Sequence, residues 1–192
     1  ENTPERHLKV WEAVLRENIF VLCKTQMAKS ITRRTLRGFR SIKVNTRYYE
    51  DLINQISHKT AKFVSQMRQG KNYWKANEDN DMKFTAIVGN PPYQEEGLNT
   101  RKAPIYHLFY DAAFKISDKV TLITPGRFLF KVGQTPKEWM DKILNDEHFK
   151  VVNYYQRSAD IFPTVEIKGG VVVTYRDAKK NFGKIGIFSE DN

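Results

Sequence analysis

The sequence predicts an α/β fold with a mostly parallel sheet, helices on both faces and an antiparallel ending. From residue 84 onward, apolar runs of strand length alternate with helical periodicities in the order β–α–β–α–β–β. Such alternation is typical of parallel sheets that are covered by helices. The last two strands follow each other without a helix, which indicates the antiparallel ending. A length of 192 residues and a hydrophobic content of 40% suffice to bury an ordinary core.

The first part of the chain is predicted to be mainly helical, and two of its helices have clear start signals. Thr3 precedes a proline at the first helical position, and apolar residues then recur at spacings of three and four. Thr25 is a second N-cap, and Gly38 closes the helix that it opens. The expected elements are, in order, a helix at 4–16, a strand at 19–22, a helix at 26–37, a strand at 41–44 and a helix at 48–69.

The remainder of the chain carries the alternating pattern. Residues 70–81 are polar and rich in turn formers, so they form the expected connector between the two parts. Residues 135–138 read as a capping box with proline at the first helical position. The expected elements are a strand at 84–89, a helix at 105–117, a strand at 119–125, a helix at 136–145, strands at 151–156 and 169–175, and an edge hairpin at 182–188.

The chain is strongly basic, with 32 Lys and Arg against 22 Asp and Glu and a net charge of +10. This excess favours a polyanionic partner such as nucleic acid. The predicted helix at 26–37 and its flanks are especially basic, which suits either a phosphate-contacting surface or a solvated face. The basic residues of this region are Lys24, Lys29, Arg33, Arg34, Arg37 and Arg40.

Several classes of protein are disfavoured by the composition. Cys23 is the only cysteine, which excludes an internal disulfide and a CxxC metal site. The four histidines are far apart and never form an i, i+4 pair, so we expect no metal. No apolar run approaches the roughly 20 residues that span a membrane, and no secretory leader is recognisable. We therefore expect a cytoplasmic protein with no membrane partner.

The apolar run at 84–89 leads directly into the loop Asn90-Pro91-Pro92-Tyr93. An apolar run between turn residues predicts a buried, central strand of a parallel sheet. Each proline pushes the preceding residue to extended geometry and lacks an N–H, but keeps its carbonyl. The loop therefore presents an Asn amide, free backbone carbonyls and an aromatic ring beyond the carboxyl end of a strand, where open α/β sheets bind ligands.

This set of groups suits a planar ligand that carries an NH₂ group, such as adenine. The exocyclic amine of adenine is a poor nucleophile, because its lone pair is delocalised into the ring. Two acceptors that hold both N–H bonds can localise the lone pair for attack while Tyr93 stacks on the base. Catalysis would then come from positioning and electrostatics, since the loop contains no strong base. A base inside a duplex would have to be flipped out first.

These residues carry a family resemblance. The loop Asn90-Pro91-Pro92-Tyr93 after an apolar strand resembles the catalytic loop of S-adenosylmethionine-dependent adenine-N6 DNA methyltransferases of the restriction–modification type. Other segments are similar to parts of the same group of enzymes. These segments are 17–20 and 33–36 upstream, 122–125 with Arg127 and Phe128, and 160–163 followed by 169–175.

The resemblance implies a Rossmann-like methyltransferase fold, S-adenosylmethionine as cofactor and double-stranded DNA as substrate. It implies that the side chain of Asn90 and the carbonyl of Pro91 accept hydrogen bonds from the adenine amine. Tyr93 would stack on one face of the base. Pro92 and Phe162 would be substrate-binding residues, with Phe162 on or against the other face. The alternative roles are a turn residue for Asn90, a packed ring for Tyr93 and a core residue for Phe162.

The sequence departs from the family pattern on the cofactor side. No glycine-rich turn follows a strand, and Cys23-Lys24 stand where the family has an acidic residue for the ribose hydroxyls. No residue is therefore assigned to cofactor binding. We expect residues 1–79 to be a partial cofactor-side region and residues 80–192 to be the catalytic half, with the missing turn before Glu1. Such a fragment could be inactive alone, with restriction or specificity subunits or domains elsewhere.

Three other functions remain open from the sequence. The same loop could hold an amino group of an RNA base or the side-chain amide of a protein glutamine. The net charge and the basic helix favour nucleic acid over protein, and Phe162 favours a flipped base. A non-catalytic DNA-binding fragment is the third alternative, because the cofactor turn is absent.

Overall fold

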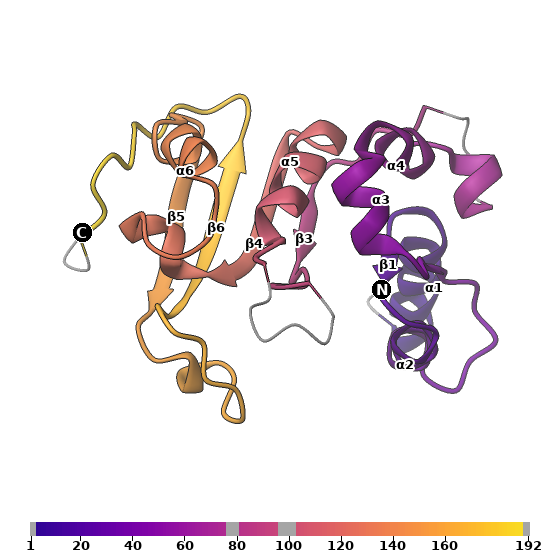
Figure 1. The fold of residues 1–192 in the computed structure, drawn as a ribbon. Helices are drawn as coiled ribbons and strands as arrows, with labels where there is room; N and C mark the ends of the chain where they lie inside the picture. The colour runs from indigo at the N-terminus through magenta and orange to yellow at the C-terminus, as the bar shows by residue number, and fades with distance from the viewer. Residues whose placement is uncertain (1–2, 76–80, 96–102, 190–192) are drawn as a thin grey trace. The chain divides into compact units, whose positions relative to one another are not determined.

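The structure, a computed structural model, describes residues 3–75, 81–95 and 103–189. The chain divides into two compact units, Glu1–Met82 (unit 1) and Lys83–Asn192 (unit 2), as Figure 1 shows in indigo to magenta and in rose to yellow. The predicted division between residues 79 and 80 lies close to this boundary. The cofactor-side and catalytic roles that we assign to the two parts stay predictions.

Unit 1 is mainly helical and contains a short two-stranded parallel sheet. The two strands pair from Phe20 with Asn45 to Cys23 with Tyr48. The elements of unit 1 are α1 (Pro4–Glu17), β1 (Phe20–Cys23), α2 (Gln26–Arg37), β2 (Asn45–Tyr48), α3 (Leu52–His58), α4 (Thr60–Met67) and the π-helical turn η1 (Gly70–Trp74).

The first two predicted helices of unit 1 are confirmed. α1 begins after Thr3, whose hydroxyl accepts a hydrogen bond from the backbone N–H of Arg6 at 3.4 Å. α2 begins after Thr25, whose hydroxyl accepts a hydrogen bond from the N–H of Ala28 at 3.1 Å. It ends at Gly38, whose φ of 61° suits a residue without a side chain. No residue of α2 is buried, so its basic side chains reach solvent.

The strand predicted at 41–44 is wrong, since the observed strand starts at Asn45. Asn45 is only 2% exposed. Its side-chain amide donates to the carbonyls of Leu15, Arg16 and Ile19 at 3.4, 2.7 and 3.2 Å. These carbonyls lie at the end of α1 and just beyond it. The buried side chain of Asn45 therefore supplies their hydrogen-bond donor, while its backbone pairs with β1. Apolar patterning cannot reveal a strand that starts in this way.

The single helix predicted over 48–69 is also wrong in extent. The chain forms two helices, α3 and α4, which are separated at Lys59 with φ −132° and ψ 35°. Buried apolar residues occur on both sides of the break, which makes the two helices look like one in the sequence. These residues are Leu52, Ile56, Phe63 and Met67.

The four strands of unit 2 form one sheet in the order β3-β4-β6-β5. β3 is parallel to β4, and β6 is antiparallel to β4 and to β5. β6 is therefore the one reversed strand of this sheet, which confirms the predicted α/β fold and its antiparallel ending. The elements of unit 2 are β3 (Ile87–Gly89), α5 (Tyr106–Ile116), β4 (Lys119–Pro125), η2 (Gly126–Phe130), α6 (Lys137–Leu144), β5 (Phe149–Tyr155), η3 (Ser158–Asp160) and β6 (Val171–Asp177).

β3 differs from the buried central strand that the apolar run predicts. It covers Ile87–Gly89 rather than 84–89, and it lies at the edge of the sheet of unit 2. Val88 is 81% exposed. A short apolar run identifies a strand, but its position in the sheet depends on partners that are distant in the sequence. Among the described residues of unit 2, β3 pairs with β4 alone.

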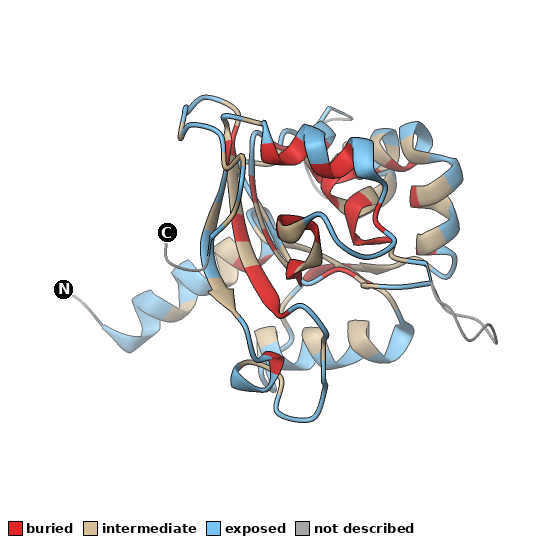
Figure 2. Cartoon of the chain, turned by 60° about the vertical axis from the view of Figure 1, so that its left-hand side comes forward, coloured by how far each residue is buried: buried red, intermediate tan, exposed pale blue. Residues whose placement is uncertain are grey.

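The core of unit 2 lies on one face of its sheet, where α5 and α6 pack against β4, β5 and β6; Figure 2 shows the buried residues in red. Tyr110 of α5 is fully buried there. Its hydroxyl lies 3.0 Å from the hydroxyl of Thr124 on β4 and 2.7 Å from that of Thr174 on β6. Burial raises the pKa of Tyr110, so the phenol stays neutral. Helices on the second face of this sheet remain a prediction.

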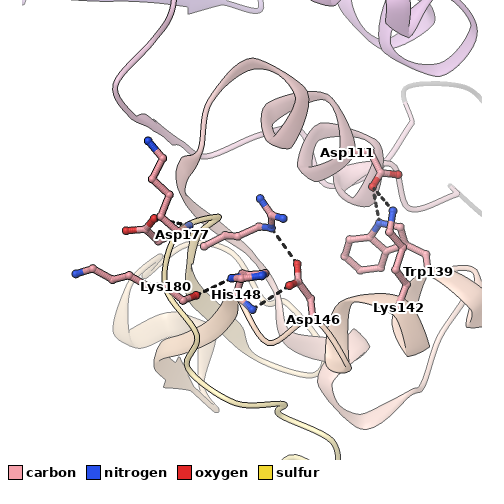
Figure 3. A network of polar contacts seen from close by, with 9 residues as sticks. Asp111, Trp139, Lys142, Asp146, His148, Asp177 and Lys180 are labelled. Atoms are coloured by element: carbon pink, nitrogen blue, oxygen red, sulfur yellow. Dashed lines mark hydrogen bonds and ion pairs between the residues drawn. The ribbon is translucent and has the colours of Figure 1, made fainter.

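A polar network closes the end of the sheet where β5 begins and β6 ends (Figure 3). The carboxylate of Asp146 accepts hydrogen bonds from Arg176 Nε and from the backbone N–H of His148, both at 2.9 Å. His148 Nδ1 lies 2.7 Å from the carbonyl of Lys180. The β4 register pairs Lys119 with Asp177, so this network is remote from the carboxyl end of β4.

The edge hairpin predicted at 182–188 is wrong, because these residues form no strand. Phe188 instead packs against Phe130 and Tyr154, with ring centroids 5.5 and 5.4 Å apart. Aromatic packing onto the body of unit 2 thus replaces ladder hydrogen bonds in this segment.

In the described parts of the chain, no helix is long and apolar enough to cross a membrane. The same residues contain no cluster of three or more His, Cys, Asp or Glu that could hold a metal ion. The thiol of Cys23 is buried and lies 3.7 Å from the hydroxyl of Thr32.

The Tyr110 hydroxyl provides a test of this core. Tyr110→Phe keeps the ring but leaves the buried hydroxyls of Thr124 and Thr174 without this partner. We expect the free energy of unfolding in urea to fall by about 1–3 kcal/mol, the cost of unsatisfied buried groups. Tyr155→Phe is the control and should change that free energy by less than about 0.5 kcal/mol. Equal effects of the two substitutions would contradict the assignment.

Candidate active site

The loop Asn90-Pro91-Pro92-Tyr93 follows the carboxyl end of β3 directly. Asn90 is exposed and Pro91 is buried. The carbonyl of Tyr93 accepts a hydrogen bond from the N–H of Ile105 at 3.1 Å. The polar tip of the loop is therefore open to a ligand, while the chain that leaves it is fixed to the start of α5.

Two residues after the loop extend this attachment. Gln94 forms an antiparallel bridge with Pro104. The N–H of Glu95 donates to the carbonyl of Ala103 at 3.0 Å. Backbone pairing thus joins the two described ends of the segment between the loop and α5. Residues 96–102 lie outside the described part of the chain.

A cavity of about 460 Å³ lies at the carboxyl ends of β3 and β4. This volume is in the range of small-molecule and cofactor sites, and the carboxyl end of parallel strands is the usual binding edge of an α/β sheet. Three segments supply its walls: the loop after β3 with the start of α5, the chain between β4 and α6, and the loop before β6. The lining residues are Tyr93, Gln94, Pro104, Tyr106, Pro125, Arg127, Gln134, Thr135, Val165, Glu166, Ile167 and Lys168.

Tyr93 is the residue of the predicted loop that lines this cavity. Its hydroxyl is buried and has no hydrogen-bond partner among the described residues. Burial raises the pKa of Tyr93 to about 12, because the charged phenolate would be poorly solvated. The side chain therefore acts as a neutral aromatic surface at ordinary pH.

The hydroxyls of Tyr106 and Thr135 form a buried pair in the cavity wall, 2.7 Å apart. This pair corrects the predicted capping box at 135–138. α6 begins after Pro136 with no side-chain cap, because the Thr135 hydroxyl is bonded to Tyr106 instead of to a helix N–H. Burial raises the pKa of Tyr106, against smaller lowering effects of the Thr135 hydrogen bond and the charge of Arg127.

The loop between β5 and β6 is organised by Ser158. Ser158 is 5% exposed. Its hydroxyl donates to the carbonyl of Val165 and accepts from the N–H of Ile167, both at 2.8 Å. These two bonds fix residues 165–168 as a wall of the cavity.

Phe162 lies in the same loop but is not among the residues that line the cavity. It is half-buried. Its N–H donates to the carbonyl of Ser158 at 2.7 Å, and its carbonyl accepts from the N–H of Val165 at 3.1 Å. In this structure Val165–Lys168, and not Phe162, face the cavity that Tyr93 lines, so the role of Phe162 against a base stays a prediction.

Tyr93 is the one lining residue that the sequence assigned to the site. The lining residues that it did not assign include Tyr106, Gln134, Thr135 and Arg127. The first three carry hydroxyl or amide groups in positions that local patterning reads as ordinary helix starts. Arg127 follows the end of the strand at 119–125, and this position is the feature of the sequence that could have indicated a residue of the site.

A known sequence family shares these features. The profile described as "Eco57I restriction-modification methylase" matches residues 17–162, which include the Asn90-Pro91-Pro92-Tyr93 loop and all but the last strand. This chain belongs to that family. The match begins before β1 and ends in the loop after β5, so it extends over both units of this Eco57I-type methylase chain.

The individual relatives that match this chain are longer than it. An uncharacterized adenine-specific methylase of Mycoplasma pneumoniae is 29% identical over 134 residues, which cover 60% of this chain and 32% of the relative. A chain of a type I restriction–modification system has a similar structure, with a TM-score of 0.50, 16% identity, and coverage of 92% of this chain and 33% of that chain. The chain therefore spans about a third of the length of each.

A lower structural similarity links the chain to SMU.776 in complex with SAH, with a TM-score of 0.42, 11% identity, and coverage of 81% of this chain and 38% of that chain. The α/β fold expected from the sequence is confirmed by the sheet of unit 2, and membership of the methylase family supports its Rossmann-like character. The site residues predicted from the sequence remain predictions.

The unpartnered hydroxyl of Tyr93 leads to a prediction with a matched control. Tyr93→Phe removes a buried hydroxyl that has no partner among the described residues, so we expect the free energy of unfolding to stay equal or to rise. Tyr106→Phe removes one member of a buried hydroxyl pair and should lower it by about 1–3 kcal/mol. Urea denaturation of both variants measures the difference. A larger loss in Tyr93→Phe than in Tyr106→Phe would contradict this description of the cavity.

Proposed function

We propose that the full-length protein is a site-specific DNA methyltransferase of a restriction–modification system. It would transfer a methyl group from S-adenosylmethionine to the exocyclic amine of a flipped adenine. The observation that carries the proposal is the position of Tyr93: it lines a cavity at the carboxyl ends of β3 and β4, directly after the acceptor loop. Membership of the Eco57I restriction-modification methylase family supports the same reaction.

In this proposal the loop would bind the amine of the adenine, and the cavity would hold its ring. The exposed side chain of Asn90 and the carbonyl of Pro91 would accept hydrogen bonds from the two hydrogens of the adenine amine. Tyr93 would stack on the base as a neutral ring, and Pro92 would contact it from the same loop. Phe162 would reach the opposite face only if the loop around it moves when DNA binds, because it does not line the cavity here.

The cofactor is proposed from the family, and the residues present do not form a complete site for it. β1 ends at Cys23 and is followed by Lys24 and the capped start of α2. A carboxylate for ribose hydroxyls is missing at this strand end, and a cation stands in its place. When bound, S-adenosylmethionine supplies the methyl group. The residues of this chain account for the substrate side of the reaction.

The proposed partners follow from the same family. We place the protein in the cytoplasm with double-stranded DNA, without a membrane partner, and with restriction or specificity subunits or domains in the same longer chain. The net charge of +10 and the exposed basic helix α2 support a polyanionic partner.

Asn90 provides the functional test. We expect Asn90→Ala in the full-length protein to lower the rate of adenine methylation in DNA by about 100-fold or more, as loss of a preorganised charge-stabilising group does. DNA affinity should change little, because the side chain contacts one amine. Transfer of radioactive methyl groups to DNA measures the rate, and mass spectrometry of nucleosides identifies N6-methyladenine.

Asn153→Ala is the matched control, because Asn153 is an exposed asparagine on β5 away from the loop. It should keep the rate within about twofold. Unchanged turnover in Asn90→Ala would falsify the assignment of the loop. If the wild-type protein methylates RNA or a protein glutamine but not DNA, the substrate is that molecule and not DNA. If the wild-type protein binds DNA but methylates neither DNA, RNA nor protein, it is a non-catalytic DNA-binding protein.

A further inference from the structure

The cavity beside Tyr93 carries two cationic side chains, Arg127 and Lys168, and one acidic side chain, Glu166. Neither cation belongs to any ion pair found among the described residues. Arg127 is half-buried, whereas Lys168 is exposed. A half-buried guanidinium without a carboxylate partner keeps its terminal N–H donors available for an anionic ligand.

The side chain of Arg127 is held in a defined position. Its Nε donates a hydrogen bond to the carbonyl of Lys168 at 2.6 Å. Its aliphatic stem runs past two glycines with positive φ, Gly133 at 92° and Gly169 at 83°. A Cβ at Gly169 would lie 2.5 Å from Arg127 Cγ, and one at Gly133 would lie 3.4 Å from Arg127 Cδ. The missing side chain of Gly169 therefore makes room for the stem of Arg127, whereas a Cβ at Gly133 would only touch it.

The turn that carries Arg127 is fixed to the loop before β6 by further bonds. The N–H of Gly126 donates to the carbonyl of Gly170 at 3.0 Å. The hydroxyl of Tyr154 donates to the carbonyl of Gly169 at 3.4 Å. Arg127 is therefore preorganised through its Nε and its stem, and the N–H groups of both terminal nitrogens have no acceptor among the described residues.

The chemistry of this arrangement selects a phosphodiester. A guanidinium presents planar, paired N–H donors that match two oxygens of one phosphate, and a neighbouring ammonium adds a point charge. Contacts of this kind fix nucleic acids in position without reading sequence. A base that stacks on Tyr93 inside the cavity would leave its own backbone at the cavity mouth, where Lys168 is exposed.

We propose that Arg127, with Lys168 beside it, binds a phosphodiester next to the nucleotide whose base enters the cavity. This inference rests on the proposed function, because it takes a flipped nucleotide as the occupant. Arg127 would hold the backbone of the flipped nucleotide in place, and its bond to the Lys168 carbonyl would connect that phosphate to the wall formed by residues 165–168. Arg127 and Lys168 are binding residues in this proposal; neither takes part in methyl transfer.

The salt dependence of DNA binding tests the contact. Each phosphate contact contributes about 0.7–0.9 to the slope of log affinity against log salt. We expect Arg127→Gln in the full-length protein to reduce this slope by about that amount and the affinity by about tenfold. Arg127→Lys should keep most of the slope, because it keeps the charge. Lys180→Gln, which removes a charge at the opposite end of the sheet, should leave the slope unchanged.

A chemically altered DNA locates the contact. The DNA sequence that the wild-type protein methylates is mapped first. The probe is an unmethylated duplex with this sequence, in which a neutral methylphosphonate replaces one phosphodiester beside the target adenine. The wild-type protein should lose about tenfold in affinity for this probe, and Arg127→Gln should lose nothing further. If Arg127→Gln does not fold, Lys168→Gln is measured instead. This variant should also show a reduced salt slope and a reduced penalty from the neutral linkage, both smaller than those expected for Arg127→Gln.

The outcomes separate this inference from the proposed function. The phosphate contact is refuted if Arg127→Gln keeps the salt slope of the wild-type protein and also loses as much affinity for the methylphosphonate probe. This holds even if the wild-type protein methylates DNA normally. A purely structural role for Arg127 would lower stability equally in Arg127→Gln and Arg127→Lys and leave both slopes intact, which also overturns it. A wild-type protein that methylates no DNA refutes the proposed function instead, whatever the slopes.

Discussion

The buried hydroxyl of Tyr110 makes the hydrogen bonds on which the core of unit 2 depends. It joins α5 to β4 through Thr124 and to β6 through Thr174, so one side chain connects a helix with two antiparallel strands. Thr124 is followed by Pro125, the last residue of β4, and the cavity begins there. A polar group this deep in an aromatic core is tolerated only because both of its partners are present. The same bonds therefore stabilise the core and lie next to Pro125, which lines the cavity.

The site is assembled from three segments that are far apart in the sequence. Parallel pairing of β3 with β4 brings the Asn-Pro-Pro-Tyr loop beside the turn after β4. Antiparallel pairing of β4 with β6, up to Pro125 with Val171, brings the loop before β6 to the same edge. Arg127 then joins the last two segments through the Lys168 carbonyl. The loop proposed to hold the target amine, the ring of Tyr93 and the side chain of Arg127 thus lie at one edge of the sheet.

Local signals in the sequence were reliable, and signals that depend on distant partners were not. The Thr25 cap and the strand Lys119–Pro125 were predicted correctly, because neighbouring residues determine them. β2 was missed because the partners of Asn45 are on α1 and just beyond it, far away along the chain. The predicted capping box is wrong because the hydroxyl of Thr135 bonds to Tyr106, which lies 29 residues away in the sequence. The Asn-Pro-Pro-Tyr loop was found from the sequence, whereas the opposite wall, formed by Val165–Lys168, depends on the two hydrogen bonds of Ser158.

Photocrosslinking from the position of the target base tests the central claim most directly. A DNA duplex carries 5-iodouracil in place of the target adenine, and the crosslinked peptide is identified by mass spectrometry after irradiation with the full-length protein. If the base enters the cavity at the carboxyl ends of β3 and β4, the crosslink forms at Tyr93. A crosslink confined to residues outside the cavity, with Tyr93 unmodified, would contradict the account.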